Sequence, residues 1–144
     1  MIDVDSSQVD DLLNKLDDDD LRRGIIFKAV KAGAKVLRDN TRNYFKSAVG
    51  AAASHVGTRY KYNFPMYEGI VMKGEKAYLE ARVSILKDFR LKFFEKGTQQ
   101  RQTKKGYNRG AMVARNFFKS ATESSWGGIE AAIQKSIDNS LKKL

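Results

Sequence analysis

The 144-residue sequence contains no cysteine, one histidine and one proline. Without cysteine it can form no disulfide framework, and it has no thiolate to act as a nucleophile or to hold a metal ion. The histidine, His55, lies among small residues and has no serine, aspartate or cysteine partner at the spacing of a catalytic or metal-binding motif. We therefore expect no catalytic residue, no metal site and no cofactor, in a protein that is not an enzyme and takes no small-molecule substrate.

A long apolar run is missing as well. The first five residues, Met1–Asp5, are acidic where a secretory signal would be basic and then apolar. No apolar stretch approaches the ~20 residues that a membrane-spanning helix needs. Gly106 and Gly110 bracket a stretch without the Lys-Ser/Thr pair of a phosphate-binding loop. These absences predict a soluble chain that stays inside the cell and has no membrane partner.

Charge is distributed unevenly along the chain. Residues 1–20 form an acidic arm of eight aspartates and one lysine, with a net charge of −7, and residues 21–144 hold nine acids and 26 bases, a net charge of +17. Such blocks mark surfaces between molecules, or a tail that folds back on its own oppositely charged body. The run Asp17–Asp20 suits the N-terminus of the following helix better than a metal ion, because consecutive side chains point in different directions.

Apolar residues at helical spacing predict three helices. A short one covers residues 6–16, and the longest, 21–49, spans roughly 40 Å at ~1.5 Å per residue. Gly33 lies on the apolar face of the long helix and indicates that another element packs closely there. A C-terminal helix covers residues 123–143. Its apolar stripe has a spacing of four and consists of Ile129, Ile133, Ile137 and Leu141.

Strands are predicted over residues 66–95, between the two long helices. Alternation of apolar and polar residues indicates one strand within 67–73 and another within 76–85. A third strand, from Phe89 to Glu95, has apolar residues at every second position up to Phe93. We therefore expect an α+β fold in which the two long helices pack on an antiparallel meander of three to four strands, all in a single domain over residues 1–144.

A basic segment, residues 96–110, follows the predicted meander. It contains no acid, and its basic residues are Lys96, Arg101, Lys104, Lys105 and Arg109. A segment of this composition cannot bury itself, so we expect a flexible loop that contacts a partner. The stretch 111–121 that follows is apolar and is predicted to be a strand or a helical turn.

Two patterns leave a structural and a binding interpretation open. Arg59–Tyr62 alternates basic and aromatic residues, which suits stacking on nucleic acid, but tyrosines packed inward from a loop or strand explain it more simply. Glu95, between Phe94 and Lys96, is either held by a salt bridge or turn hydrogen bond or makes a contact with another subunit.

The order of these features resembles that of a known family. An aromatic strand that ends in Glu-x-Gly-Thr corresponds to Phe93 and Phe94 followed by Glu95, Gly97 and Thr98. Together with the long helix, the meander, the basic loop and the C-terminal helix, this motif resembles the head–tail joining and tail-completion family of long-tailed double-stranded-DNA bacteriophages. The resemblance extends over residues 20–142.

A second segment both matches and departs from this family. Its Arg-Pro-Phe-x-x-Pro-Ala pattern is matched by Arg115, Phe117 and Ala121, whereas Asn116 and Ser120 stand where prolines are expected. Without the prolines, the rigid extended conformation that they impose is lost. The family's Thr-Gly-x-Leu signature after the first long helix is not recognisable in this chain.

The resemblance implies a virion or prophage component without enzymatic activity, assembled in the cytoplasm of a host bacterium. It would form a homo-oligomeric ring at the neck or tail end, bind other neck and tail proteins, and contact the passing DNA only passively. We expect subunit contacts at Glu95, Gly97, Thr98, Arg101, Lys104, Lys105, Arg109, Arg115, Phe117, Phe118, Asp17, Asp18, Asp19 and Asp20.

Opposite charges suggest how such a ring would close. A ring requires two different patches that meet across each interface, and residues 1–20 would dock on the basic loop or the long helix of the neighbouring subunit. The alternative is a basic nucleic-acid-binding protein that contacts DNA phosphates. The sequence contains no helix with arginine and asparagine at a base-reading spacing, which favours the assembly protein.

Overall fold

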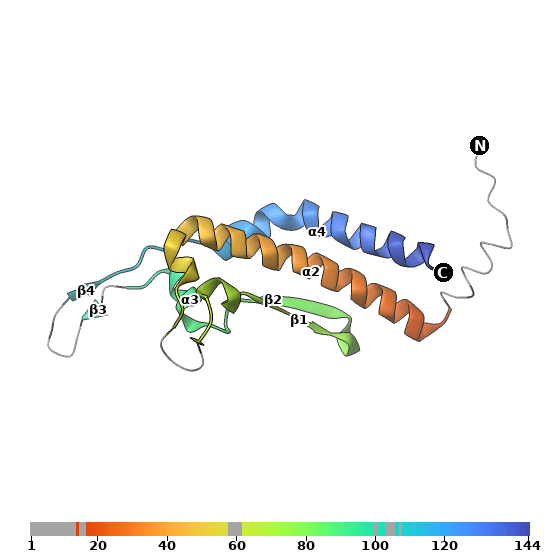
Figure 1. Ribbon diagram of the computed structural model, residues 1–144, viewed down its shortest axis with the longest axis horizontal. Coiled ribbons are helices and arrows are strands. Elements are labelled where there is room, and N and C mark those ends of the chain that lie inside the picture. The colour runs from red at the N-terminus through yellow and green to blue at the C-terminus, as the bar shows by residue number, and fades with distance from the viewer. Residues whose placement is uncertain (1–13, 15–16, 58–61, 100, 103–105, 107) are drawn as a thin grey trace.

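The computed structural model describes residues 14, 17–57, 62–99, 101–102, 106 and 108–144. The helices and strands are α2 (Asp19–Val49), β1 (Val71–Glu75), β2 (Glu80–Ser84), α3 (Phe89–Lys96), β3 (Arg101–Gln102), β4 (Asn108–Gly110) and α4 (Phe117–Lys142). Short 3₁₀ helices connect some of them, namely η1 (Gly50–Ser54), η3 (Met66–Gly69) and η4 (Lys76–Tyr78). The antiparallel helices α2 and α4 lie side by side, and the β1–β2 hairpin lies along α2 on the side away from α4 (Figure 1). This mixture of helices and a small antiparallel sheet agrees with the α+β class.

The long helix α2 agrees with the predicted helix over 21–49 and begins two residues earlier. Asp18 is its N-cap, and the Asp18 carboxylate accepts hydrogen bonds from the backbone N–H groups of Asp20 (3.0 Å) and Leu21 (3.4 Å). Asp19 and Asp20 lie in the first turn, where negative charge is stabilised by the helix dipole. The capping role expected for this acidic run is therefore confirmed.

Helices α2 and α4 approach each other closely at Gly33. A Cβ atom at this position would lie 3.0 Å from side-chain carbons of both Ile129 and Ile133, so a larger residue would require these side chains to shift. This confirms the close packing expected at Gly33 and the docking role of the isoleucine stripe. The C-terminal helix begins at Phe117, six residues earlier than predicted, and it runs through Gly127 and Gly128 without a break.

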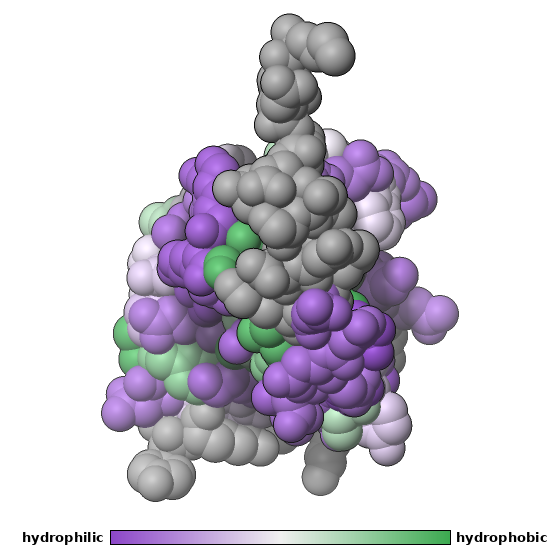
Figure 2. Space-filling view, turned by 90° about the vertical axis from the view of Figure 1, so that its right-hand side faces the viewer, coloured by the Kyte–Doolittle hydropathy of each residue, from purple (hydrophilic) through white to green (hydrophobic). Residues whose placement is uncertain are grey.

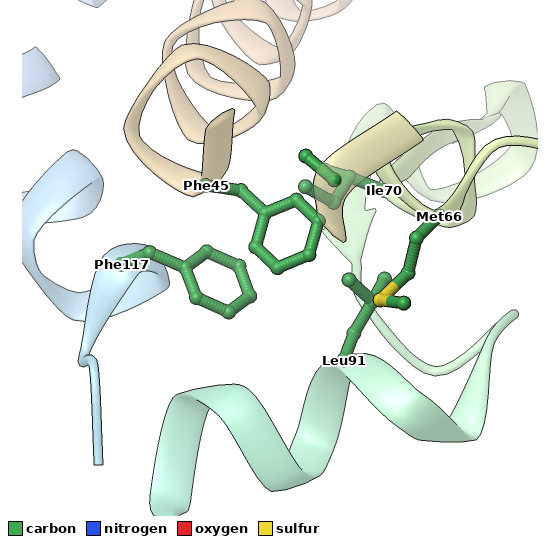
Figure 3. Packing of buried hydrophobic residues seen from close by; sticks show 6 residues of the cluster. Phe45, Met66, Ile70, Leu91 and Phe117 are labelled. Carbon is green, nitrogen blue, oxygen red and sulfur yellow. The ribbon is translucent and has the colours of Figure 1, made fainter. Parts of the chain in front are cut away.

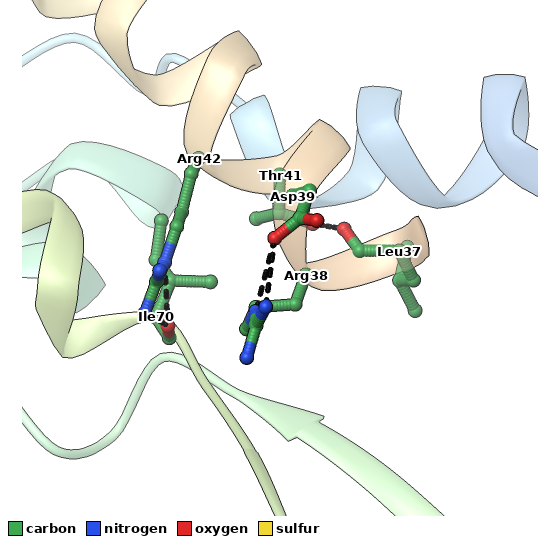
Figure 4. Close-up of polar contacts among 6 residues, drawn as sticks. All are labelled: Leu37, Arg38, Asp39, Thr41, Arg42 and Ile70. Atoms are coloured by element: carbon green, nitrogen blue, oxygen red, sulfur yellow. Dashed lines mark hydrogen bonds and ion pairs between the residues drawn. The ribbon is translucent and has the colours of Figure 1, made fainter. Parts of the chain in front are cut away.

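The β1–β2 hairpin is shorter than the two predicted strands. Its register pairs Val71 with Ser84 and Glu75 with Glu80, and η4 forms the turn. The hairpin is fixed to α2 at its entry, because the Arg42 guanidinium donates hydrogen bonds of 2.8 and 3.0 Å to the Ile70 carbonyl oxygen (Figure 4). Residues 66–69 are a 3₁₀ helix instead of the start of a strand.

The predicted third strand, Phe89–Glu95, is wrong, because this segment is helix α3. Asp88 starts the helix as its N-cap and accepts a 3.0 Å hydrogen bond from the Arg90 backbone N–H. Leu91 and Glu95, four positions apart, are the buried residues of the helix. Among the described residues, the strands form two separate two-stranded sheets, so a meander of three to four strands is not observed.

The main hydrophobic core lies where the C-terminal end of α2 meets α3, η3 and the start of α4. Its buried side chains are Phe45, Ala53, Met66, Ile70, Leu91 and Phe117 (Figure 3). The ring centroids of Phe45 and Phe117 are 4.8 Å apart, which is within the range of favourable aromatic pairs. Three elements that are distant in the sequence are therefore joined by one aromatic cluster.

Two predictions fall wholly or partly outside the described residues. The predicted helix over 6–16 is represented only by Asn14, which is helical and exposed. Of the Arg59–Tyr62 pattern, only Tyr62 is described. Tyr62 is 9% exposed and its ring centroid lies 5.2 Å from that of Phe89, so at this position the inward-packed interpretation is confirmed.

Candidate functional site

The Glu-x-Gly-Thr motif lies at the end of α3, where the carboxylate of Glu95 caps helix α4. Its Oε2 atom accepts a 2.8 Å hydrogen bond from the Phe118 N–H, and its Oε1 atom accepts one of 3.1 Å from the Lys119 N–H. Glu95 is only 5% exposed. The N-cap residue of α4, Asn116, makes no side-chain capping bond itself. A buried carboxylate from another element therefore satisfies the free N–H groups and the positive end of the α4 dipole.

Gly97 ends α3 in a conformation that favours glycine, with φ of +71°. A Cβ atom here would lie 2.6 Å from the Met112 carbonyl oxygen and 2.8 Å from the Ala114 nitrogen. The backbone of residues 112–114 thus passes directly over Gly97. A side chain at this position would require both a strained backbone and a shift of the segment 112–114.

Thr98 completes the contact with this passing segment. Its N–H donates a 3.0 Å hydrogen bond to the Met112 carbonyl, and its Oγ1 accepts a 2.9 Å bond from the Met112 N–H. Further along, the Arg115 N–H donates to the Phe94 carbonyl at 2.8 Å. We call this arrangement the clasp, meaning Glu95, Gly97 and Thr98 with their contacts to residues 112–119. It joins the end of α3 to the start of α4.

The clasp also closes the base of a projecting hairpin. Strands β3 and β4 pair Arg101 with Gly110 and Gln102 with Asn108, and the hairpin extends beyond the end of the helical layers (Figure 1). The predicted basic loop therefore contains a short antiparallel hairpin. Its backbone leaves the body at Thr98 and returns at Met112, the two residues joined by the clasp. Lys104 and Lys105 lie outside the described residues.

The other predicted contact residues have different surroundings. Phe117 is 1% exposed and belongs to the core, and Phe118 packs against this core. The Phe117 side chain is therefore buried within its own chain. Arg115 is exposed. Asp17–Asp20 are exposed as well, and they lie at the opposite end of the molecule from the β3–β4 hairpin (Figure 1).

The two departures from the family's proline pattern fit this geometry. Asn116 has φ of +50°, a value that proline cannot adopt because its ring holds φ near −65°. Ser120 donates its backbone N–H to the Asn116 carbonyl at 2.9 Å, and proline has no N–H to donate. The start of α4 in this chain therefore follows a path that the proline-containing pattern would not allow.

An ion pair at the N-terminal end of α3, between Asp88 and Arg90, was not predicted from the sequence. Asp88 is fully buried and its carboxylate accepts a 2.9 Å hydrogen bond from Nε of Arg90. This hydrogen bond raises the pKa of the Arg90 guanidinium. Gly69 makes room for it, since a Cβ atom there would lie 2.7 Å from the Cβ of Asp88. The signal in the sequence was an aspartate directly before the apolar residues of α3.

The described residues contain no group of three or more histidine, cysteine, aspartate or glutamate side chains that could hold a metal ion. None of the described helices is both long enough and apolar enough to cross a membrane. Comparisons with protein-family models, with curated proteins and with solved structures found no match.

Proposed function

We propose that this chain is a structural virion protein of a tailed bacteriophage, a head–tail joining or tail-completion component that assembles as a ring at the neck or tail end. The observation that carries the proposal is the clasp. The Glu95-x-Gly97-Thr98 motif, on which the family resemblance rests, holds the base of a projecting basic hairpin. A motif with this role suits a protein that works through contacts between subunits.

The distribution of charge along the molecule supports a head-to-tail ring. The β3–β4 hairpin belongs to a segment with five basic residues and no acid, and Asp17–Asp20 lie at the opposite end (Figure 1). In a ring of identical subunits, the basic end of one subunit meets the acidic end of the next. Such complementarity orients the subunits and disfavours like-charged pairings.

An open groove beside the clasp offers a second surface to a neighbouring subunit. It is lined by Val83, Ser84, Ile85, Leu86, Glu95, Lys96, Phe118 and Lys119. Leu86 is 74% exposed, and Lys96 and Lys119 are exposed next to it. A groove that is lined by an exposed apolar side chain and by two lysines suits a partner with both apolar and acidic side chains.

Light scattering on the purified protein at ~0.15 M salt tests the hairpin's role in assembly. The variant R101E/K104E/K105E/R109E reverses four charges of the hairpin segment and should fall to the mass of a monomer, while the wild type forms a closed oligomer. A matched control, K73E/K76E/K92E/K142E, reverses four exposed lysines elsewhere. Equal masses for the wild type and the hairpin variant would exclude the hairpin as a subunit contact.

The second candidate function, binding of DNA phosphates, is favoured by the net charge of +17 on residues 21–144. Phosphate binding releases counterions and weakens steeply as salt increases. The ring protein should therefore bind duplex DNA only weakly in a gel shift at ~0.15 M salt. Tight binding under these conditions, lost in the hairpin variant, would support the nucleic-acid-binding alternative.

A further inference from the structure

A groove with three lysines runs between the first half of α2 and the second half of α4. Its lining residues are Lys28, Ala32, Ala132, Lys135, Ser136, Asn139 and Lys143. The three lysines are exposed, no acid lines the groove, and none of the ion pairs between described residues involves these lysines. The groove is therefore lined by small side chains and by three lysines whose charge is not neutralised by an ion pair with any described residue.

The groove lies at the end of the molecule where α2 begins and α4 ends. Seen from this end, the described surface is mostly hydrophilic, with smaller hydrophobic patches between the charged residues (Figure 2). Lys28 lies ten residues after the N-cap Asp18, which corresponds to ~15 Å along the axis of α2. Any segment that precedes α2 is therefore tethered next to the groove.

Residues 1–16 match the groove in charge and in polarity. They carry four aspartates and one lysine, and their apolar residues Val9, Leu12, Leu13 and Leu16 recur at the spacing of one helical face. An amphipathic helix can place such a face on Ala32, Ala132 and the aliphatic stems of the lysines, while its carboxylates meet the ammonium groups. A helix over 6–16 would be ~16 Å long, so it covers the distance from Asp17 to Lys28.

We propose that residues 1–16 fold back and occupy the groove lined by Lys28, Lys135 and Lys143 of their own chain. The short tether gives this segment a high effective concentration at its own groove. When docked, it would neutralise the charge of the three exposed lysines. The proposal does not depend on the phage role, because it rests only on the groove, its charges and the position of the segment.

Trypsin provides a direct measurement, because Lys15 is the single basic residue among the first 20. Cleavage after Lys15 releases residues 1–15, and mass spectrometry follows this peptide over time. Proteolysis of a segment that opens and closes rapidly tracks the population of the open form. In K28E/K135E/K143E, loss of three surface ion pairs should speed the release about tenfold. Raising the salt from ~0.05 M to ~0.5 M should speed the release in the wild type as well.

The control variant K73E/K92E/K119E reverses three exposed lysines that do not line the groove, and it should release the peptide at the wild-type rate. Equal release rates in all three proteins would overturn the proposal. If, in addition, the groove variant alone lost affinity for duplex DNA, the groove would be a nucleic-acid site. The groove variant could have a lower melting temperature than the control. Release is therefore measured at a temperature well below the unfolding transitions of both variants.

The absence of native cysteine allows a second test, which separates docking within one chain from docking between chains. Asn14→Cys with Asn139→Cys places one thiol in the segment and one in the groove, and a disulfide within a monomer is expected after mild oxidation. Gln134→Cys replaces the groove cysteine in the control, because Gln134 is exposed, lies outside the groove lining and should give little cross-link. A covalent dimer as the main product would overturn docking on the segment's own chain.

Discussion

The two ends of α2 are held in different ways. At the C-terminal end, large side chains such as Phe45 and Leu91 are fully buried, and the clasp adds directed hydrogen bonds around Glu95. In the first half of α2, the buried residues are the small Ala29 and Gly33, and the surroundings are charged and exposed. One end is therefore held by a hydrophobic core and directed hydrogen bonds, and the other presents charged, exposed side chains.

This comparison predicts that mutations at the two ends differ in what they change. Substitutions in the core and the clasp should lower the free energy of unfolding by large amounts. Substitutions around Asp17–Asp20 should change stability little and act mainly on contacts. The following variants test this contrast, and each is measured by urea unfolding with a matched control.

Phe45→Ala should have the largest effect. It removes the ring that packs on both Phe94 and Phe117, and loss of a buried phenylalanine costs about 3–5 kcal/mol. The control is Tyr44→Ala at the neighbouring position, where the side chain is 40% exposed and the cost should stay below about 1 kcal/mol. Similar losses for the two variants would mean that the aromatic cluster does not dominate this end.

Gly97→Ala should cost about 2–4 kcal/mol, because it combines a strained backbone with a clash against residues 112–114. Gly110→Ala separates the two causes. Gly110 has a similar φ of +72°, but nothing lies within 4 Å of its missing Cβ, so only the strain of about 1–2 kcal/mol remains. If the Gly110 variant were the less stable one, the close passage over Gly97 would not be important.

Glu95→Gln should cost about 1–2 kcal/mol, since the amide keeps one acceptor but loses the charge at the N-terminus of α4. The exposed Glu123, also on α4, provides the control, and Glu123→Gln should change stability by less than about 0.5 kcal/mol. The same variant also tests the alternative role of Glu95. A stable Glu95→Gln protein that fails to assemble would assign Glu95 to a subunit contact.

Asp18→Ala should have the smallest effect, about 1 kcal/mol, because it removes the N-cap of α2 at an exposed end. Asp17→Ala, which removes an equal charge one residue earlier, should be close to neutral in stability. Both variants should lower the tendency to assemble to a similar degree if the acidic run is a contact surface. A much larger loss of stability in Asp18→Ala would contradict the contrast between the two ends.

The sequence predicted the two long helices well because their signals are local and redundant. The apolar face of α2 continues over many turns, and an acidic cap precedes it. The isoleucine stripe and Gly33 similarly indicated the contact between α4 and α2. The early start of α4 was missed because its cap, Glu95, comes from a residue 23 positions away from Phe118.

Helix α3 could not be predicted from alternation alone. Within residues 89–93, apolar side chains at positions 89, 91 and 93 fit a strand, but Leu91, Phe94 and Glu95 fit one face of a helix equally well. Asp88 as an N-cap would have favoured the helix. The clasp could not be predicted from the sequence, because only the folded chain brings Gly97 and Thr98 into contact with residues 112–114.

Negative-stain electron microscopy of the full-length protein at high concentration tests the central claim most directly. The account predicts closed rings of uniform diameter for the wild type and the lysine control, and single particles for the hairpin variant R101E/K104E/K105E/R109E. Particles that remain single in all three proteins and coat duplex DNA at ~0.15 M salt would contradict it.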